Sequence, residues 1–108
     1  RYNEAFSAFD AISATLPTGQ DVTNSHWLYS ILLDRESRDL LRFLGERKIQ
    51  TRPLWKPLSS LSYLADCHVV SDDNTRDLAE RALSLPCSVG LAKDDQGKVI
   101  EAVSDYLG

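Results

Sequence analysis

The sequence predicts an α+β fold in which helices pack on a small, mainly antiparallel β-sheet. Residues 26–33 alternate between large apolar and mixed positions, which is the pattern of a half-buried strand. Four other segments place apolar residues three or four positions apart, the spacing of an amphipathic helix. Helical and extended patterns follow one another through 108 residues, a length typical of one domain. We therefore expect residues 1–108 to form a single two-layer domain.

The first element is a helix predicted from Tyr2 to Leu16, where Pro17 ends it. Its apolar face consists of Tyr2, Ala5, Phe6, Phe9, Ile12 and Leu16. The strand at residues 26–33 follows. Successive side chains of a strand point to opposite faces, so its large apolar residues are expected to face the core together. These residues are Trp27, Tyr29, Ile31 and Leu33.

The middle of the chain predicts two further helices. One begins after Asp34 or Ser37, either of which suits an N-cap, and ends near Gly45. Its buried stripe is Leu40, Leu41 and Leu44. After a short helical turn at residues 59–64, another helix is expected at residues 75–83. The side chains expected to point inward from it are Leu78, Ala79, Ala82 and Leu83.

The C-terminal part predicts a short strand or extended segment at residues 85–87 and a last helix that opens at Asp94 and Asp95. Negative charge is favourable there because the N-terminus of a helix is the positive end of its dipole. The expected buried face of this helix is Val99, Ile100, Val103 and Leu107.

The most unusual stretch of the sequence is residues 51–58. Two prolines bracket Trp55, and each biases the residue before it, Arg52 or Lys56, towards an extended backbone. One interpretation is a stiff binding segment, whose two cations and aromatic face hold an anionic, partly planar ligand such as a nucleotide diphosphate. The alternative is an edge strand with solvated basic side chains and with Trp55 buried in the core.

Other residues with site chemistry are few. His26, at the start of the predicted strand, either lines a site or makes a local hydrogen bond at the strand end. The sequence has no Gly-rich phosphate loop and no GxSxG motif. A Schiff-base lysine needs a desolvated setting, whereas Lys48, Lys93 and Lys98 stand among charged residues and the proline-flanked Lys56 suits binding better. We therefore expect the chain to be catalytically incomplete by itself.

Composition argues against several classes of partner. The net charge of −4 gives no basic footprint for nucleic acid. No apolar run approaches the roughly 20 residues that cross a membrane, and no signal peptide is visible. Cys67 and Cys87 lack the paired spacing of a zinc site or a disulfide framework, so we predict no metal and reduced thiols in a cytoplasmic protein.

Several segments, taken together, resemble a known family. They are Arg1-Tyr2-Asn3 with the helix after it, residues 25–29 (SHWLY), 38–41 (RDLL), 48–51 (KIQT), 52–58 (RPLWKPL), 79–87 (AERALSLPC) and 98–103 (KVIEAV). In this order, and over the whole chain, they are similar to the C-terminal small domain of the DegT/StrS-type nucleotide-sugar aminotransferases, which are pyridoxal-phosphate enzymes of fold type I. Residues 52–58 look like the version found in branches that aminate 4-keto amino sugars for bacterial surface glycans.

The chain departs from the family pattern at several positions. Many members carry a His-Tyr pair where Leu54 and Trp55 stand here, and a histidine where Ser59 stands. Substrate contacts made through those histidines are therefore not carried over. Lys48 replaces a usual glycine, and Ala92 replaces a usual threonine or serine cap.

The resemblance implies a C-terminal small domain of a longer enzyme, and the start at Arg1 without a methionine agrees with that. The large domain, absent from this sequence, would bind pyridoxal 5'-phosphate and supply the Schiff-base lysine. The enzyme would be a cytoplasmic homodimer that transfers an amino group, expected from glutamate, to a nucleotide-linked keto sugar. Arg52, Trp55 and Lys56 are then the expected substrate contacts, and His26 and Ser59 are candidates to line the site. The fragment alone is expected to bind no cofactor and to be inactive.

Three alternatives stay open at this point. Some relatives use the same cofactor for sugar dehydration, with a histidine in place of the Schiff-base lysine, and this domain does not separate the two. A second alternative is a non-catalytic α+β binding or regulatory module. A third is a degenerate, inactive family member, which the serine at position 59 favours.

Overall fold

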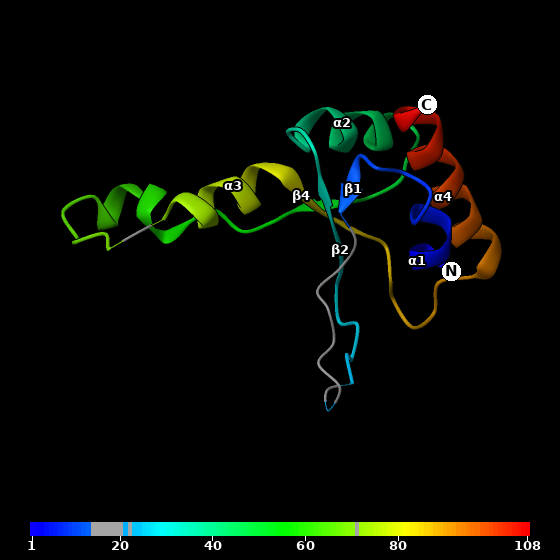
Figure 1. The fold of residues 1–108 in the computed structure, drawn as a ribbon, viewed down its shortest axis with the longest axis horizontal. Coiled ribbons are helices and arrows are strands. Elements are labelled where there is room, and N and C mark those ends of the chain that lie inside the picture. Colours follow the sequence, from blue (N-terminus) through cyan, green and yellow to red (C-terminus); the bar gives the residue numbers. More distant parts are fainter. Residues whose placement is uncertain (14–20, 22, 71) are drawn as a thin grey trace.

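A small antiparallel sheet lies at the centre of the computed structural model, which describes residues 1–13, 21, 23–70 and 72–108 (Figure 1). Within these residues the sheet has four strands in the order β1-β2-β4-β3, and every neighbouring pair is antiparallel. The strands are β1 (Ile12–Ser13), β2 (Tyr29–Leu33), β3 (Arg52–Pro53) and β4 (Ala82–Leu85). The α+β fold with an antiparallel sheet, predicted from the sequence, is confirmed.

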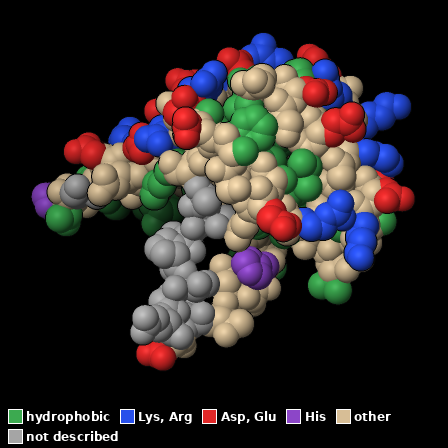
Figure 2. Space-filling model, turned by 45° about the vertical axis from the view of Figure 1, so that its right-hand side comes forward, with side chains coloured by type: hydrophobic (Ala, Val, Ile, Leu, Met, Phe, Trp, Pro, Cys, Tyr) green, Lys and Arg blue, Asp and Glu red, His purple; other side chains and the backbone are tan. Residues whose placement is uncertain are grey.

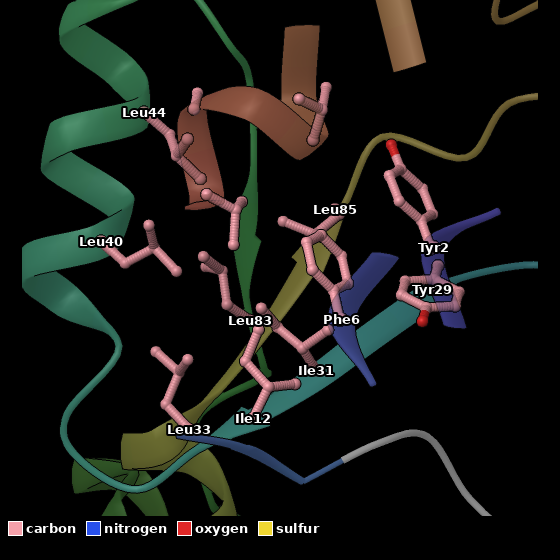
Figure 3. Packing of buried hydrophobic residues seen from close by; sticks show 13 residues of the cluster. Tyr2, Phe6, Ile12, Tyr29, Ile31, Leu33, Leu40, Leu44, Leu83 and Leu85 are labelled. Atoms are coloured by element: carbon pink, nitrogen blue, oxygen red, sulfur yellow. The ribbon is translucent and has the colours of Figure 1, made fainter. Parts of the chain in front are cut away.

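Three helices share a hydrophobic core with one face of this sheet: α1 (Tyr2–Phe6), α2 (Arg38–Glu46) and α4 (Lys93–Leu107). Figure 3 shows side chains from β2 and β4 meeting those from α1 and α2. Tyr29 and Ile31 of β2 lie opposite Leu85 and Leu83 of β4, so four apolar side chains point to the same face. We call the sheet and these three helices the body.

The predicted stripes of α2 and α4 agree with this core. Leu40 and Leu44 of α2 are both 0% exposed, as is Val103 of α4. Ser37 precedes α2, as expected of an N-cap, but its hydroxyl donates to the Glu80 carbonyl at 2.9 Å and so joins α2 to the residues before β4. None of the described helices is both long and apolar enough to span a bilayer.

The first predicted helix is wrong beyond Phe6. The chain leaves the helix there, and Ile12 pairs with Leu33 in the short β1–β2 ladder. The Asp34 N–H also donates to the Ala11 carbonyl at 2.9 Å. Phe6 and Ile12 are nevertheless part of the core, as expected. Ile12 reaches the core through strand pairing instead of through a helix. The predicted end of the helix, Leu16 and Pro17, lies outside the described residues.

The boundary between α3 (Asp73–Arg81) and β4 also differs from the prediction. Ala82 and Leu83 were expected on the inner face of a helix, but both lie in β4, where they pair with β2. Pairing along four residues of β2 outweighs the local helical pattern, since it buries all of β4. The expected inward face of α3 is wrong too, because Leu78 is 44% exposed and no α3 residue is fully buried. The predicted short strand at residues 85–87 ends at Leu85, where it belongs to β4.

Residues 57–70 and 72–81 leave the body as a projection, which we call the arm and which extends to the left in Figure 1. The arm contains two 3-10 turns, Leu58–Ser60 and Ser62–Leu64, followed by α3. The predicted helical turn at residues 59–64 is therefore confirmed. Figure 2 shows hydrophobic side chains at the surface of both the projection and the body, with charged side chains of both signs interspersed among them.

The end of α2 has an unusual backbone. Lys48 adopts a left-handed conformation with φ of 60°, and its N–H donates to the Gly45 carbonyl at 2.9 Å. The Ile49 N–H donates to the Leu44 carbonyl at 2.9 Å. These two hydrogen bonds form a Schellman motif, in which the left-handed residue is usually glycine. The lysine at a usual glycine position is therefore under backbone strain.

Candidate functional site

An open groove of about 1080 Å³ lies at the end of the sheet where β2 begins and β4 ends. Residues 25–28 and 47–52 contribute to its lining, together with residues 84–91 and part of α4. Its volume is comparable with that of small-molecule sites in proteins. The groove is therefore our candidate functional site.

Two backbone features single out this groove. In the described part of the chain, the non-glycine residues with positive φ are His26, at 50°, and Lys48, at 60°, and both line the groove. Such conformations are uncommon for residues with a side chain and cluster at functional sites. Their position on two separate segments of one groove supports a functional interpretation.

His26 is held by local contacts. Its backbone N–H donates to Asn24 Oδ1 at 2.7 Å. The Cys87 thiol donates to the carbonyls of His26 and Trp27, with distances of 3.8 and 3.5 Å from Sγ to the oxygens. The exposed side chain of His26 lines the groove. His26 therefore shows features of both sequence interpretations: it makes a local hydrogen bond and it lines a candidate site. Its role in binding stays a prediction.

Arg52 lies in the groove because of its register. It pairs with Ser84 of β4, whose hydroxyl is hydrogen-bonded to that of Ser30 at 2.8 Å. Ser30 and Ser84 alternate with the core-facing residues, so Arg52 lies on the face opposite the core. Within the described residues, no ion pair involves Arg52 or Lys56, and both are exposed. Both cations are therefore accessible to an anionic ligand.

Trp55 is 70% exposed, so the alternative that buried it in the core is wrong. The other half of that alternative is correct, because residues 52 and 53 form the edge strand β3. Trp55 stacks on Trp27, with ring centroids 6.3 Å apart and an angle of 29° between the planes. Trp27 was expected in the core as part of the strand, but β2 begins only at Tyr29 and Trp27 is 78% exposed.

Ser59 lies on the arm and is not among the residues that line the groove. Its hydroxyl donates to Asp72 Oδ2 at 2.5 Å, and Arg76 Nε donates to the same oxygen at 2.5 Å. The Ser59 hydrogen bond, followed by that of Arg76, lowers the pKa of Asp72. The structure thus brings His26 and Arg52 together, places Trp55 beside them through Trp27, and gives Ser59 a contact within the arm.

Two groove residues were missed by sequence reasoning. Trp27 was hidden by the alternating pattern, which continues without a break from Trp27 into the strand. Lys48 had a visible signal, because it stands where the family usually has a glycine, and the structure shows that this position needs a positive φ. Lys48 therefore adds a cation to the groove at the expense of backbone strain.

The residues present do not fit a covalently held pyridoxal phosphate. Lys48, Lys56, Lys93 and Lys98 are the four lysines of the chain, and all are exposed. A Schiff-base lysine needs a lowered pKa, whereas the hydrogen bond to Asp95 raises the pKa of Lys98. No chemical step through this cofactor is therefore assigned to the chain itself.

These features define the class of the protein: an α+β domain with a ligand-sized groove and without a desolvated lysine. The model of the DegT/DnrJ/EryC1/StrS aminotransferase family matches residues 1–104. The chain belongs to this family.

Individual relatives agree with this assignment. The chain is 31% identical to the putative pyridoxal phosphate-dependent aminotransferase EpsN of Bacillus subtilis (strain 168), over 95% of this chain and 28% of EpsN. The crystal structure of the aminotransferase TlmJ from Streptoalloteichus hindustanus is 30% identical, with a TM-score of 0.87, over 99% of this chain and 29% of TlmJ. A family aminotransferase from Brucella abortus is 29% identical, with a TM-score of 0.80, over 100% of this chain and 29% of that protein. The chain therefore spans less than a third of the length of each relative.

Proposed function

We propose that this chain is the C-terminal small domain of a cytoplasmic, homodimeric, pyridoxal phosphate-dependent aminotransferase. Its substrate is a nucleotide-linked keto sugar used in surface glycan or polysaccharide biosynthesis, and its amino donor is glutamate. One observation carries the proposal: the family match extends over nearly all of this chain but under a third of each relative. Cofactor binding and catalysis then belong to the complete enzyme.

In this proposal the chain contributes substrate binding and closure of the site. The Arg52 guanidinium offers paired N–H donors that match the oxygens of a diphosphate, and Lys56 adds a second positive charge. Trp55 offers an aromatic face to a sugar or base. The prolines after Arg52 and Lys56 limit the backbone freedom that binding would otherwise remove.

The exposed lysines support the same division of labour. A covalently held cofactor requires a desolvated lysine, which would have to come from another part of the enzyme. The arm supports the proposal as well, because Leu58, Tyr63 and Val70 are 69%, 78% and 90% exposed. Exposed apolar side chains of this kind suit a surface that packs against more protein.

The first test is the absorption spectrum of the complete protein after loading with pyridoxal phosphate, with the 108-residue chain as the blank. A band that borohydride abolishes, present in the complete protein and missing from the blank, supports a lysine-bound cofactor. Absence of the band contradicts the aminotransferase proposal. That outcome would favour a dehydratase-like relative or a non-catalytic module.

The second test addresses Arg52 in the complete enzyme. Arg52→Ala should raise KM for a nucleotide-linked 4-keto sugar at least tenfold, because it removes a charge-assisted contact. KM for glutamate should stay unchanged. Arg38→Ala is the matched control, since Arg38 is exposed on α2 and is not among the groove residues. If Arg38→Ala raised KM as much as Arg52→Ala, Arg52 would act only through the overall charge of the protein and not through a contact with the substrate.

A further inference from the structure

Two tryptophan side chains form an exposed pair at the edge of the groove. Trp27 lines the groove, and Trp55 stacks on it from the next segment. Their exposed fractions are 78% and 70%, whereas tryptophan is usually highly buried. Residues 27 and 55 come from different segments, so the tertiary fold brings the two rings together. A large aromatic surface thus stays open to solvent beside Arg52.

The backbone at Trp27 and the residue before it makes several local contacts within the chain. Asn24 Oδ1 accepts the N–H of His26, and His26 has a left-handed conformation. The Cys87 thiol then contacts the carbonyl of Trp27 itself, at 3.5 Å. These contacts limit the conformational entropy that the segment would lose on binding a ligand.

The geometry of the pair decides where a planar ligand can bind. For a ring to fit between the two indoles, their planes would have to be separated by about twice the ~3.5 Å contact distance between carbon atoms. The centroids are 6.3 Å apart, so the pair is already closed against such an insertion. A planar group therefore has access only to the outer faces of the pair, and Trp27 is the member of the pair that lines the groove.

The charges around the pair favour an anionic ligand over an apolar protein surface. The basic residues on one segment of the groove are Arg47, Lys48 and Arg52. The acidic residues that line the groove are Asp95, Glu101 and Asp105, all on α4, and of these Asp95 is paired with Lys98 at 2.7 Å. An apolar partner would desolvate the cations without compensation, which is costly, whereas a diphosphate would pair with them.

We propose that the exposed face of the Trp27–Trp55 pair stacks on the nucleobase of a nucleotide-linked ligand whose diphosphate is bound by Arg52. Trp27 thereby becomes a substrate-binding residue. This inference rests on the proposed function and deepens it, because it divides one site into a stacking part and an anion-binding part. Stacking on an aromatic face tolerates different bases, since every base has a π-face.

The test is calorimetric titration of the complete protein with UDP, dTDP, GDP and CDP, and with inorganic pyrophosphate as the probe that lacks a base. Trp27→Ala should weaken binding of the preferred nucleoside diphosphate about tenfold and leave pyrophosphate affinity unchanged. Trp27→Phe should retain most of the affinity. Trp55→Ala should weaken nucleotide binding in the same direction as Trp27→Ala.

Tyr63→Ala is the control for loss of an aromatic ring, because Tyr63 lies on the arm and is not among the residues that line the groove. It should leave nucleotide affinity unchanged. The proposal is overturned if Trp27→Ala binds nucleotides like the unsubstituted protein, or if pyrophosphate affinity falls in parallel. It is also overturned if none of the four nucleoside diphosphates binds the unsubstituted protein at millimolar concentration.

Failure of this inference can be told apart from failure of the proposed function. A borohydride-sensitive cofactor band together with unchanged nucleotide affinity in Trp27→Ala keeps the aminotransferase and removes the stacking platform. Selective loss of nucleotide affinity without such a band keeps the platform and removes the lysine-bound cofactor. The two measurements use different signals, so neither result depends on the other.

Discussion

The body and the arm of this domain differ in how far they bury their hydrophobic side chains. In the body, Leu33 and Leu83 are 0% exposed and lie in one core shared by the sheet and three helices (Figure 3). In the arm, Tyr63 and Val70 are 78% and 90% exposed, and α3 has no fully buried residue. The body therefore contains its own apolar partners within the chain, whereas the arm presents apolar side chains without burying them.

The overall dimensions reflect this difference. The radius of gyration is 15.4 Å, compared with about 13 Å for a compact domain of this length. The contacts that hold the arm together are in part polar, as in the pairing of Asp72 with both Ser59 and Arg76. We therefore expect the body to be the stable unit and the arm to depend more on its surroundings.

The largest effect expected from this comparison is on core packing. Leu83→Ala, at 0% exposure in β4, should lower the free energy of unfolding by about 3 kcal/mol, because it leaves a cavity in the core. The matched substitution in the arm, Leu58→Ala, should change it by less than about 0.5 kcal/mol, since that side chain is 69% exposed. Urea denaturation of both variants measures the difference. Equal losses would contradict the division into body and arm.

The same contrast explains which elements the sequence could predict. The stripes of α2 and α4 were predictable because their apolar residues stay on one helical face and the core covers that face. Ala82 and Leu83 were placed in a helix because local spacing does not show that β2 lies alongside them. Their strand depends on pairing between residues about 50 positions apart, which no local pattern contains.

The candidate groove could be predicted in part for a similar reason, since Arg52 lines it and Trp55 stacks on Trp27, whereas Lys56 is not among its lining residues. Arg52, Trp55 and Lys56 stand out locally, since prolines constrain the backbone around them. Trp27 and Lys48 become groove residues only after the fold has joined separate segments. The left-handed conformation of Lys48 also requires the three-dimensional structure, although the missing glycine pointed to it.

The next largest effect concerns a buried tyrosine of the body. Burial is the main cause that raises the pKa of Tyr2, from its ordinary value of 10.0 to about 12, and its hydroxyl donates to the Pro86 carbonyl at 2.8 Å. The folded state therefore holds this proton at a pH where the unfolded chain releases it. The contribution of Tyr2 to the free energy of unfolding is therefore fully present below pH 10 and is lost as pH rises towards 12.

The expected loss for Tyr2 is about 1–2 kcal/mol across this range. Denaturation of the 108-residue chain at pH 9 to 12 should show it. Tyr2→Phe should be somewhat less stable at pH 9, because the Pro86 carbonyl loses its donor, and should lose less stability as pH rises. An unchanged slope in the variant would mean that another group, such as the buried Tyr29, dominates the alkaline transition.

A smaller effect, of opposite sign, is expected at the end of α2. Lys48→Gly should raise the free energy of unfolding by about 1 kcal/mol, because glycine adopts the left-handed conformation without a side-chain penalty. Lys48→Ala is the matched control, since it removes the charge but keeps a side chain at φ of 60°. Urea midpoints at constant slope measure both variants. If Lys48→Ala gained as much stability as Lys48→Gly, the gain would come from removal of the charge and not from relief of backbone strain.

The smallest effect is expected in the arm, where Ser59 and Arg76 lower the pKa of Asp72. A lowered pKa in the folded state means that the contribution of Asp72 is present above the ordinary carboxyl pKa and is lost as pH falls through the folded value. Ser59→Ala should raise the pKa of Asp72 and speed amide hydrogen exchange in residues 58–70 and 72–76, because local contacts control local opening. The amides of β4 should exchange as before.

Two outcomes would change this view of the molecule. If amide exchange in the arm is unaffected by Ser59→Ala, apolar contacts hold the arm and the polar pairing is incidental. If exchange in β4 accelerates together with the arm, the two regions open as one cooperative unit, although Leu83 is buried and Leu58 is exposed. Only selective acceleration in the arm agrees with a body that is stable by itself and an arm that depends on its surroundings.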